Sequence, residues 1–488
     1  MPDFDEDLIS VQEARNAVMQ AHQAQLIWQH ASQADVDRVC AAMVGAGEAV
    51  AESLGRLANE ETGYGVPAHK KLKNLLATRV LWDQIKDEKT VGVIRQDEAH
   101  KVYDIAWPMG VVAALVPSTN PTSTAMFKAI IAVKARDGIV VAPHPTAVKC
   151  TAEATRILAD AAVKAGAPAG LIQCLTHVSL PGTSELMKHH YTALILATGG
   201  SAMVKAAHSV GKPAYGVGPG NVPCYVDRSA DVAQAAKYIV ASKAFDHSVI
   251  CATEQAVVAD LPVASELQRL MEQEGAYFVN EQQADLLRNL LFDAAGGINQ
   301  KTVGKSAAVL AQMAGFSIPA GTRVLAAKLS KVGREEPLSR EKLTTVLGWY
   351  EVDGWEKGCE RCIELIKFGG DGHSLSIHAR DEKVIMAFGL EKPVHRIVVN
   401  TMSSLGGVGM TTGVAPSMTL GPGGVGGAIT GDNITVKHLF SVKRLAYEIR
   451  KPPEEAMHEE TSGAGGSSVK DVDVDEIVRR VLNQLGRS

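Results

Sequence analysis

The chain has 488 residues, more than a single domain usually holds, so two domains and a smaller appendage are expected. Hydrophobic residues make up 46% of it and charged residues 21%, as in globular proteins that bury large cores. The net charge is −5 with scattered Lys and Arg, and no apolar run reaches the roughly 18 to 20 residues that span a bilayer. Neither a nucleic-acid-binding protein nor a membrane protein is therefore expected.

The first half of the chain predicts helices followed by a Rossmann-like sheet. Residues about 10–60 carry Ala, Gln, Glu and Val at helical spacing and predict one or two amphipathic helices. From residue 110 on, apolar β-rich runs alternate with helical stretches, which favours a parallel sheet buried on both faces. The predicted strands are 110–117, 138–143, 171–175 and 193–198, and the predicted helices are 122–135, 151–166 and 203–208.

A second alternation of strands and helices predicts a second α/β domain. It begins with a strand at 223–227 and continues to about residue 420. The elements predicted within it are helices at 230–244, 264–274 and 281–292 and a strand at 323–328. The fold class expected from the whole pattern is α/β with two parallel sheets.

The end of the chain changes composition. Residues 451–471 hold Pro, Gly, Ser and charges with almost no large apolar side chain, which predicts a flexible linker. Residues 472–486 are periodic again. At about 100° per residue, an arc of roughly 140° holds Val474, Ile477, Val478, Val481, Leu482 and Leu485, as in an amphipathic helix. So short a helix is marginal alone, and we expect it to order against a partner groove or back on its own subunit.

The cysteines indicate a reducing compartment. Their number, seven, is odd, and they are spread over a long chain, which favours free thiols over a disulfide framework. The acidic start MPDFDEDLIS does not have the charge of a secretory signal, so a cytoplasmic protein is expected. Cys359 and Cys362 form a lone CxxC, which predicts two buried thiols on one helical turn and no metal site.

The motif that carries chemistry is KAFDHSVICATEQAVV (243–258), in which Cys251 stands before a strand-like run among small residues. This stretch resembles the nucleophile segment of aldehyde dehydrogenases. It is most similar to the acylating half of bifunctional aldehyde/alcohol dehydrogenases and to the CoA-acylating enzymes of bacterial microcompartments. The resemblance extends to about residue 447 and includes VPSTNPTSTAMFKA (116–129), ATGGSAMVKAAHSVGKPAYGVGPGN (197–221), EKLTTVL (341–347) and GVAPSMTLGPGGVGG (413–427).

The resemblance implies an aldehyde dehydrogenase fold, with two Rossmann-like domains, an oligomerisation segment and the amphipathic tail helix. A dinucleotide-binding domain would cover 1–222 and a catalytic thiol domain 223–420. Residues 421–450 would return to the cofactor domain, followed by the linker 451–471 and the helix 472–486. In the family, the segments matching 90–106 and 433–447 contribute to subunit contacts, so a homo-oligomer, dimer or tetramer, is expected.

Cys251 is the expected nucleophile, because a thiolate adds to an aldehyde and leaves as a thioester after oxidation. The resemblance implies that the Cys251 N–H and an amide side chain hold the oxyanion, with Asn120 as the candidate donor. A gapless match to hydrolytic relatives instead puts Thr119 where they carry Asn, so both residues are candidates. Alternatively, Asn120 only caps the helix that begins near Pro121.

Two further segments are candidates for binding NAD. The turn ATGGS follows a predicted strand and opens a helix, so its backbone N–H groups could take a pyrophosphate. In the family the equivalent turn serves the dinucleotide, which assigns this role to Gly199, Gly200 and Ser201. Glu341 resembles the family's Glu that binds the nicotinamide ribose, although Thr345 replaces the usual Pro of that motif. An ordinary surface Glu is the alternative.

A missing carboxylate suggests CoA as the second substrate. Hydrolytic relatives carry a general-base Glu in a segment that reads GVGPGN (216–221) here, with Gly216 in the Glu position. Without that base the thioester should survive until the CoA thiol attacks it. Pro143 and His144 stand where hydrolytic members favour Lys near the adenosine ribose, which is compatible with a site for NAD and then CoA.

Two histidines have open roles. His247 precedes Cys251 by four residues and could tune the thiol, but a packing or hydrogen-bonding role is favoured. His373 matches a His that recurs in acylating relatives, and a structural role is again favoured over proton transfer.

The expected function is reversible oxidation of a short-chain aldehyde to acyl-CoA with NAD reduction. The rivals are a hydrolytic dehydrogenase that gives the free acid and a catalytically silent shell-binding scaffold. A linker followed by a short amphipathic helix resembles the encapsulation peptides of microcompartment enzymes. That resemblance implies the microcompartment lumen as location and shell proteins as partners of 472–486.

Overall fold

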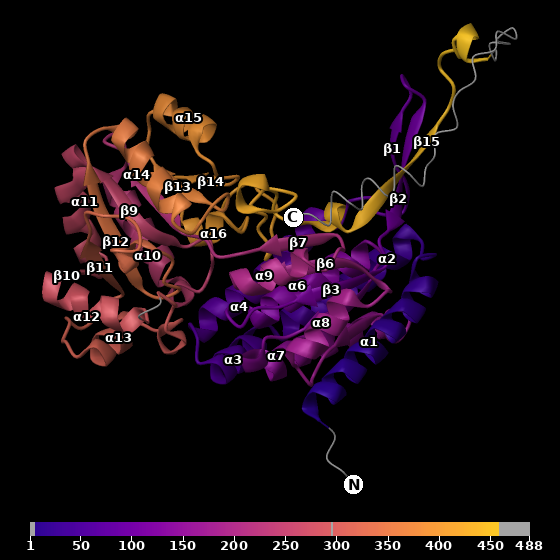
Figure 1. Cartoon of the computed structure of the whole chain (residues 1–488), viewed down its shortest axis with the longest axis horizontal. Coiled ribbons are helices and arrows are strands. Elements are labelled where there is room, and N and C mark those ends of the chain that lie inside the picture. The colour runs from indigo at the N-terminus through magenta and orange to yellow at the C-terminus, as the bar shows by residue number, and fades with distance from the viewer. Residues whose placement is uncertain (1–4, 294–295, 458–488) are drawn as a thin grey trace, which may run out of the picture. The chain divides into compact units, whose positions relative to one another are not determined.

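The computed structural model describes residues 5–293 and 296–457 (Figure 1). Among these, residues 5–95 and 104–444 form one large unit, and residues 96–103 with 445–457 form a small one. The predicted helix 472–486 and the end of the predicted linker lie outside the described residues. The candidate site residues all belong to the large unit.

The large unit begins with helices α1 (Glu6–Trp28), α2 (Gln33–Ala49), α3 (Ala51–Thr62) and α4 (Pro67–Leu75). A π-helical turn (Leu76–Val80) and α5 (Leu81–Ile85) follow. The prediction of one or two helices over residues 10–60 was too low, since this stretch contains parts of three helices, α1, α2 and α3. Ser32 and Asp35 form a capping box that starts α2, and Gly63 ends α3 at φ +68°, a conformation that favours glycine.

A five-stranded sheet follows, in the order β5-β4-β3-β6-β7, with every neighbouring pair parallel. The chain builds β3, β4 and β5 outward on one side and then returns to add β6 and β7 on the other. Such an order places a switch point between β3 and β6, where ligands bind outside the carboxyl ends of the strands. The strands are β3 (Val111–Leu115), β4 (Gly138–Ala142), β5 (Ile172–Cys174), β6 (Thr192–Thr198) and β7 (Ala214–Val217).

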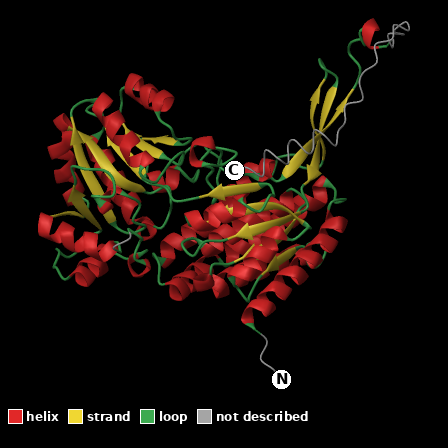
Figure 2. Ribbon diagram, in the orientation of Figure 1, coloured by secondary structure: helices red, strands yellow, loops and turns green. Residues whose placement is uncertain are grey.

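Helices cover both faces of this sheet (Figure 2). Along β3, Val112 and Ala114 belong to the apolar cluster shared with α2, α6 and α7, while Val111 and Ala113 belong to the cluster shared with α1, α8 and α9. Because side chains alternate across a strand, a strand apolar throughout needs cover on both sides, as the sequence predicted. The new helices are α6 (Pro121–Lys134), α7 (Val148–Lys164), α8 (Leu180–Lys188) and α9 (Ser201–His208).

The second domain has a seven-stranded parallel sheet in the order β10-β11-β12-β9-β8-β13-β14. The strands are β8 (Val222–Val226), β9 (Glu254–Asp260), β10 (Ala276–Val279), β11 (Val324–Lys328), β12 (Val346–Val352), β13 (Leu375–His378) and β14 (Ile397–Val399). Two parallel sheets of this kind confirm the predicted fold class.

Helices also cover both faces of the second sheet. One face packs against α10 (Val232–Ala244) and α11 (Leu261–Gln273). The other packs against α12 (Glu281–Leu291), α13 (Ala307–Ala314), α14 (Trp355–Lys367) and α15 (Glu382–Glu391). The short helix α16 (Ser403–Gly406) follows β14. Cys359 and Cys362 lie buried on α14, which confirms the prediction of two buried thiols on one helix.

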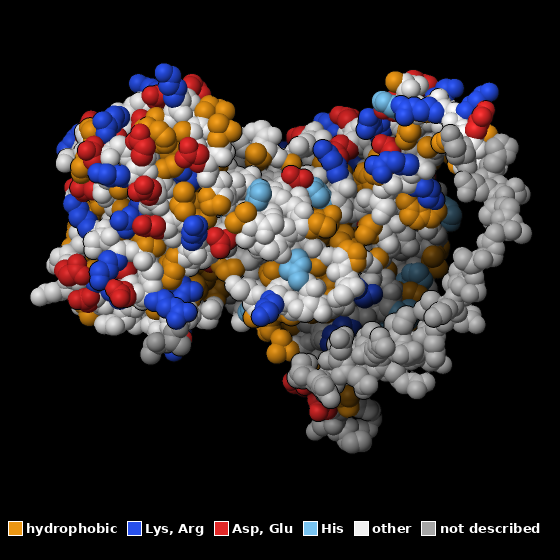
Figure 3. Space-filling view, turned by 45° about the horizontal axis from the view of Figure 1, so that its top comes forward, with side chains coloured by type: hydrophobic (Ala, Val, Ile, Leu, Met, Phe, Trp, Pro, Cys, Tyr) orange, Lys and Arg blue, Asp and Glu red, His pale blue; other side chains and the backbone are white. Residues whose placement is uncertain are grey.

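Three further strands, β1 (Gly92–Asp97), β2 (Val102–Pro108) and β15 (Phe440–Ala446), form a small sheet in the order β1-β2-β15. From Ser441 to Ala446 every residue of β15 is exposed. On the face shown in Figure 3, Lys and Arg side chains are interspersed with Asp and Glu over the seven-stranded domain. None of the helices in the described ranges combines the length and apolarity needed to cross a bilayer.

Candidate active site

The candidate residues of the first domain follow the carboxyl ends of its strands. Thr119 and Asn120 come after β3, His144 after β4, and Gly199 to Ser201 after β6. Strands β4, β3 and β6 are neighbours in the sheet, so these loops leave the same edge, on and beside the switch point. The fold therefore brings the predicted oxyanion and dinucleotide segments together.

The candidate residues of the second domain precede the amino ends of its strands. Glu341, Cys251, Gly220 and His373 come shortly before β12, β9, β8 and β13 respectively. These four strands are adjacent in that order, so four residues far apart in the chain meet at one edge of the sheet.

Gly220 joins this group at close range. Its N–H donates to Glu341 Oε1 at 3.2 Å. A Cβ built on Gly220 would lie 2.6 Å from the Cys251 carbonyl oxygen and 3.0 Å from the His373 ring. Only a residue without a side chain fits between the nucleophile and the histidine.

Cys251 lies in the turn before β9 and is partly exposed. Burial among protein atoms raises the pKa of its thiol to about 12, and the Glu341 carboxylate acts in the same direction. Arg396 and the backbone N–H groups of Cys251 and Ala252 act in the opposite direction. The resting nucleophile is therefore a thiol, and backbone donors are already directed at its sulfur.

The turn that presents Cys251 has an unusual backbone. Asp246, His247 and Ser248 have φ values of +47°, +49° and +67°, which non-glycine residues rarely adopt. The buried Asp246 carboxylate accepts the Val66 N–H at 2.6 Å and fixes the turn to α4. His247 Nδ1 lies 3.0 Å from the Gly304 carbonyl oxygen, which is the hydrogen-bonding role that the sequence favoured.

Asn120 is at the N-cap of α6, but its side chain makes no capping hydrogen bond. The capping alternative was therefore right about the position of Asn120 and wrong about the role of its side chain. Its Oδ1 accepts from the Lys73 ammonium at 2.6 Å. Its amide nitrogen donates to Thr119 Oγ1 at 3.1 Å and to the Val249 carbonyl at 3.3 Å. Of the two oxyanion candidates, Asn120 thus contacts the nucleophile turn directly, and Thr119 contacts Asn120.

Glu341 is buried, only 7% exposed, so the alternative of an ordinary surface glutamate was wrong. Burial raises the pKa of its carboxyl to about 7. A second buried glutamate, Glu254, lies three residues after Cys251, and burial raises its pKa to about 7 as well. Glu254 accepts from the Ser242 hydroxyl at 2.5 Å and the Ser403 N–H at 2.9 Å, so its oxygens are committed to the fold.

The ATGGS turn has room for a phosphate group. A Cβ on Gly200 would meet nothing within 4 Å, and Ser201 is exposed at the start of α9. The first N–H groups of a helix have no intrahelical partner and favour anions. Pro143 is buried and His144 is exposed, and the His144 ring accepts the Thr146 N–H at 3.2 Å. These residues fit a dinucleotide along the strand ends.

Gly216 does not face the nucleophile. A Cβ there would lie 2.4 Å from the His208 ring and 2.6 Å from Val204, both on α9. The residue of this segment that faces Cys251 is Gly220. The prediction that this segment supplies no general base still holds, because GVGPGN contains no carboxylate at any position.

His373 is buried, and burial lowers the pKa of its ring to about 3, so it is neutral. Its Nδ1 lies 2.9 Å from the Ser374 hydroxyl. Its Nε2 is buried and has no hydrogen-bond partner among the described residues. Arg396 donates to the His373 carbonyl oxygen at 2.9 Å and holds this loop.

Gly220, Arg396 and Lys73 of α4 were not predicted from the sequence. Arg396 is 3% exposed and also bonds Asn433 and the carbonyl groups of Gly421 and Gly431. The sequence held a signal for Arg396, which directly precedes the apolar stretch 397–399. A charge beside a buried strand is rare unless it has a partner. Gly220 gave no signal, since its importance lies in contacts between distant segments.

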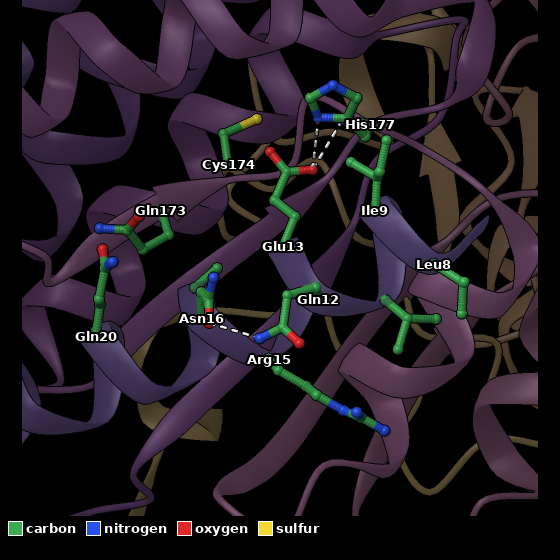
Figure 4. A pocket seen from close by; sticks show the side chains of 12 residues that line it. Leu8, Ile9, Gln12, Glu13, Arg15, Asn16, Gln20, Gln173, Cys174 and His177 are labelled. Carbon is green, nitrogen blue, oxygen red and sulfur yellow. Dashed lines mark hydrogen bonds and ion pairs between the residues drawn. The ribbon is translucent and has the colours of Figure 1, made fainter. Parts of the chain in front are cut away.

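A separate groove lies between the start of α1 and residues 173–177 (Figure 4). Glu13 points toward His177 there and accepts the N–H groups of Thr176 and His177. Burial raises the pKa of Cys174 to about 12, and no charged group lowers it. The described residues include no group of three side chains able to hold a metal. This groove lacks the convergent groups found around Cys251.

Residues 7–279 match the sequence profile of the aldehyde dehydrogenase family. The chain belongs to this family. It is 44% identical to the aldehyde-alcohol dehydrogenase of Streptococcus pneumoniae over 79% of this chain and 45% of that protein. The chain thus spans about half the length of the bifunctional relatives. It is 37% identical to the acetylating succinate-semialdehyde dehydrogenase of Clostridium kluyveri over 81% of this chain and 87% of that one.

Solved structures give the same family. The acetylating aldehyde dehydrogenase of Geobacillus thermoglucosidasius is 49% identical, with a TM-score of 0.91 over 92% of this chain and 99% of that one. A propionaldehyde dehydrogenase from the Clostridium phytofermentans fucose utilisation microcompartment is 27% identical, with a TM-score of 0.81 over 89% of this chain and 97% of that one. The Rhodopseudomonas palustris propionaldehyde dehydrogenase, solved with bound CoA and an acylated cysteine, is also 27% identical, with a TM-score of 0.80 over 89% of this chain and 97% of that one.

Proposed function

We propose that the protein oxidises a short-chain aldehyde to an acyl-CoA, with NAD⁺ as oxidant and Cys251 as nucleophile. The observation that carries the proposal is the surroundings of Cys251: Gly220 packs between its backbone and the neutral His373 ring, and GVGPGN holds no carboxylate. The segment GVGPGN therefore supplies no base that could activate water to attack a thioester on Cys251. The relatives named as acetylating, and the one solved with CoA, support the same conclusion.

The covalent steps follow from the residues present. The Cys251 thiol first loses its proton to solvent, and the thiolate then adds to the aldehyde carbon and gives a tetrahedral oxyanion. The Asn120 amide, beside Thr119, and the Cys251 N–H stabilise this oxyanion. Loss of a hydride from the same carbon collapses it to a thioester. The CoA thiol then attacks the thioester carbon, and the Cys251 thiolate leaves. All steps are reversible.

The cofactor site is proposed at the carboxyl edge of the five-stranded sheet. NAD⁺, when bound, supplies the hydride acceptor. The open turn of Gly199, Gly200 and Ser201 would hold its pyrophosphate, and Pro143 and His144 would flank its adenosine end. Glu341, buried beside Gly220, would bind the nicotinamide ribose. The same crevice would take CoA after the reduced cofactor leaves.

The first test is to trap the acyl-enzyme. Incubation with propionaldehyde and NAD⁺ without CoA should add one propionyl group to the peptide that contains Cys251, detected by mass spectrometry. The Cys251→Ala variant should form no acyl-enzyme and no NADH. Cys224→Ala removes a thiol fully buried in β8 and should keep both. Equal NADH formation by Cys251→Ala and the wild type would refute the mechanism.

We further propose that residues 472–486 are an encapsulation helix that directs the enzyme into a bacterial microcompartment. The support is their single apolar stripe after the linker 451–471, together with the microcompartment origin of one structural relative. Truncation after residue 455 should leave catalysis intact. A fluorescent fusion of 456–488 should collect in shells when shell proteins are co-expressed. A diffuse fusion, or loss of catalysis on truncation, would contradict this proposal.

A further inference from the structure

A buried charge cluster connects the two halves of the active site. Lys70 and Lys73 on α4 are each 2% exposed, and both bind the fully buried Asp246 carboxylate. Asp246 belongs to the left-handed turn that presents Cys251. Two lysine side chains thus bind one carboxylate in the turn that precedes the nucleophile.

The two lysines differ in their second contact. Lys70 donates to the Thr119 backbone carbonyl at 3.3 Å. Lys73 donates to the Asn120 side-chain oxygen at 2.6 Å. A backbone carbonyl has a fixed orientation, whereas a side-chain amide can turn over and exchange its oxygen and nitrogen. Of these two lysine contacts, only that of Lys73 affects which way the Asn120 amide points.

Burial lowers the pKa of Lys73 to about 7, and the neighbouring Asp246 carboxylate favours its charged form. In that form the ammonium has donors and no acceptor, so Lys73 bonds only the oxygen of the Asn120 amide. The NH₂ group is therefore held on the opposite side. There it donates to Thr119 Oγ1 at 3.1 Å and to the carbonyl of Val249, two residues before Cys251, at 3.3 Å. The bond to Val249 is the longer one, and an oxyanion on the substrate could replace its acceptor.

We propose that Lys73, anchored by Asp246, is a positioning residue that holds the Asn120 amide with its NH₂ group toward the reacting carbonyl. The inference rests on the proposed function, in which Asn120 stabilises the oxyanion. Lys73 touches neither substrate nor thiol, and its effect passes through Asn120. In its absence only the 3.3 Å bond to the Val249 carbonyl still selects this orientation, so the amide presents its oxygen to the oxyanion for part of the time.

The test measures the pre-steady-state NADH burst with propionaldehyde and NAD⁺ in the absence of CoA. Lys73→Met keeps the apolar stem and removes the ammonium, and should slow the burst about 10- to 100-fold. Lys70→Met removes the other lysine that binds the Asp246 carboxylate and is the matched control. It should lower thermal stability to a similar extent yet keep the burst rate within about threefold of wild type.

A double-mutant cycle separates positioning from a general structural role. In an Asn120→Ala background, Lys73→Met should slow the burst no further than about threefold, because its target is gone. Lys73→Gln carries an amide donor that can reach the Asn120 oxygen, and should recover most of the lost rate. If Lys73→Met does not fold, the same cycle is run with Lys73→Gln and Lys73→Ala.

The outcomes are distinguishable. Multiplicative effects of Lys73→Met and Asn120→Ala, or an equal loss of burst rate in Lys70→Met, would overturn the positioning role. A wild-type burst in Asn120→Ala would overturn the oxyanion assignment on which it rests. Absence of any burst in the wild-type enzyme would instead refute the proposed function itself.

Discussion

At the scale of single residues, the contacts of Gly220 give a sharp prediction. A methyl group at this position would lie 2.6 Å from the Cys251 carbonyl oxygen, so Gly220→Ala must displace the nucleophile backbone. We expect a loss of about 100-fold in kcat, since a displacement of the nucleophile by about 1 Å misaligns the reacting groups. Gly369→Ala is the control, because a Cβ there meets nothing within 4 Å. Wild-type kcat in Gly220→Ala, measured as NADH formation, would show that the backbone adjusts freely.

The Cys251 thiol gives a second prediction. Burial raises its pKa to about 12, so the thiolate fraction should keep growing through neutral and alkaline pH. In the cofactor-free enzyme, iodoacetamide labelling of the Cys251 peptide should accelerate about tenfold per pH unit from pH 7 to 10. Labelling that levels off below pH 8 would mean that the thiol is activated before any ligand binds.

Residue identities could be read from the sequence where they belong to a continuous motif. Cys251 was assigned from its own segment, and Asn120 with Thr119 from theirs. Glu341 was assigned, but its burial was not, because burial depends on distant segments such as that of Gly220, 121 residues earlier. Gly216 was assigned by matching GVGPGN to the general-base segment of hydrolytic relatives, and the structure shows that a side chain there faces α9 instead.

At the scale of elements, the carboxyl edge of the seven-stranded sheet carries a titratable group outside the proposed chemistry. His378, in β13, is 1% exposed, and neither ring nitrogen has a partner among the described residues. Burial lowers the pKa of its ring from 6.5 to about 4. The unfolded chain therefore binds a proton between these values that the folded chain cannot, so stability falls as pH falls through about 6.5.

Replacing that histidine should reduce the acid sensitivity of the fold. Between pH 7.5 and 5, His378→Leu should lose about 2 kcal/mol less stability than the wild type, from the size of the pKa shift. The measurement is the thermal unfolding midpoint of both proteins at the two pH values. An identical drop in both would show that His378 does not determine the acid response.

Several strands with continuous apolar runs could be predicted, but β12 and the sheet order could not. The runs at 110–117, 138–143 and 193–198 became β3, β4 and β6. The short β7 and β14 were missed, because four residues with a glycine, or three residues, carry too little periodicity to identify. The convergence of β12, β9, β8 and β13 arises from crossovers, and no local pattern encodes it.

At the scale of the whole molecule, the small sheet β1-β2-β15 predicts self-association. Trp107 and Val442 are 49% and 39% exposed, and β15 is exposed along nearly its whole length. A second copy would remove this apolar surface from water. Light scattering at micromolar concentration should therefore give a mass of at least twice 51.7 kDa. A mass near 51.7 kDa would contradict this expectation.

We expect the thioester on Cys251 to persist until CoA attacks it. NADH formation with and without CoA tests this most directly. In the presence of an aldehyde and NAD⁺ alone, we expect one NADH per active site and then almost no further turnover. Addition of CoA should start steady turnover, with acyl-CoA formed in step with NADH. Rapid multiple turnover to the free acid without CoA would contradict the account and identify a hydrolytic enzyme.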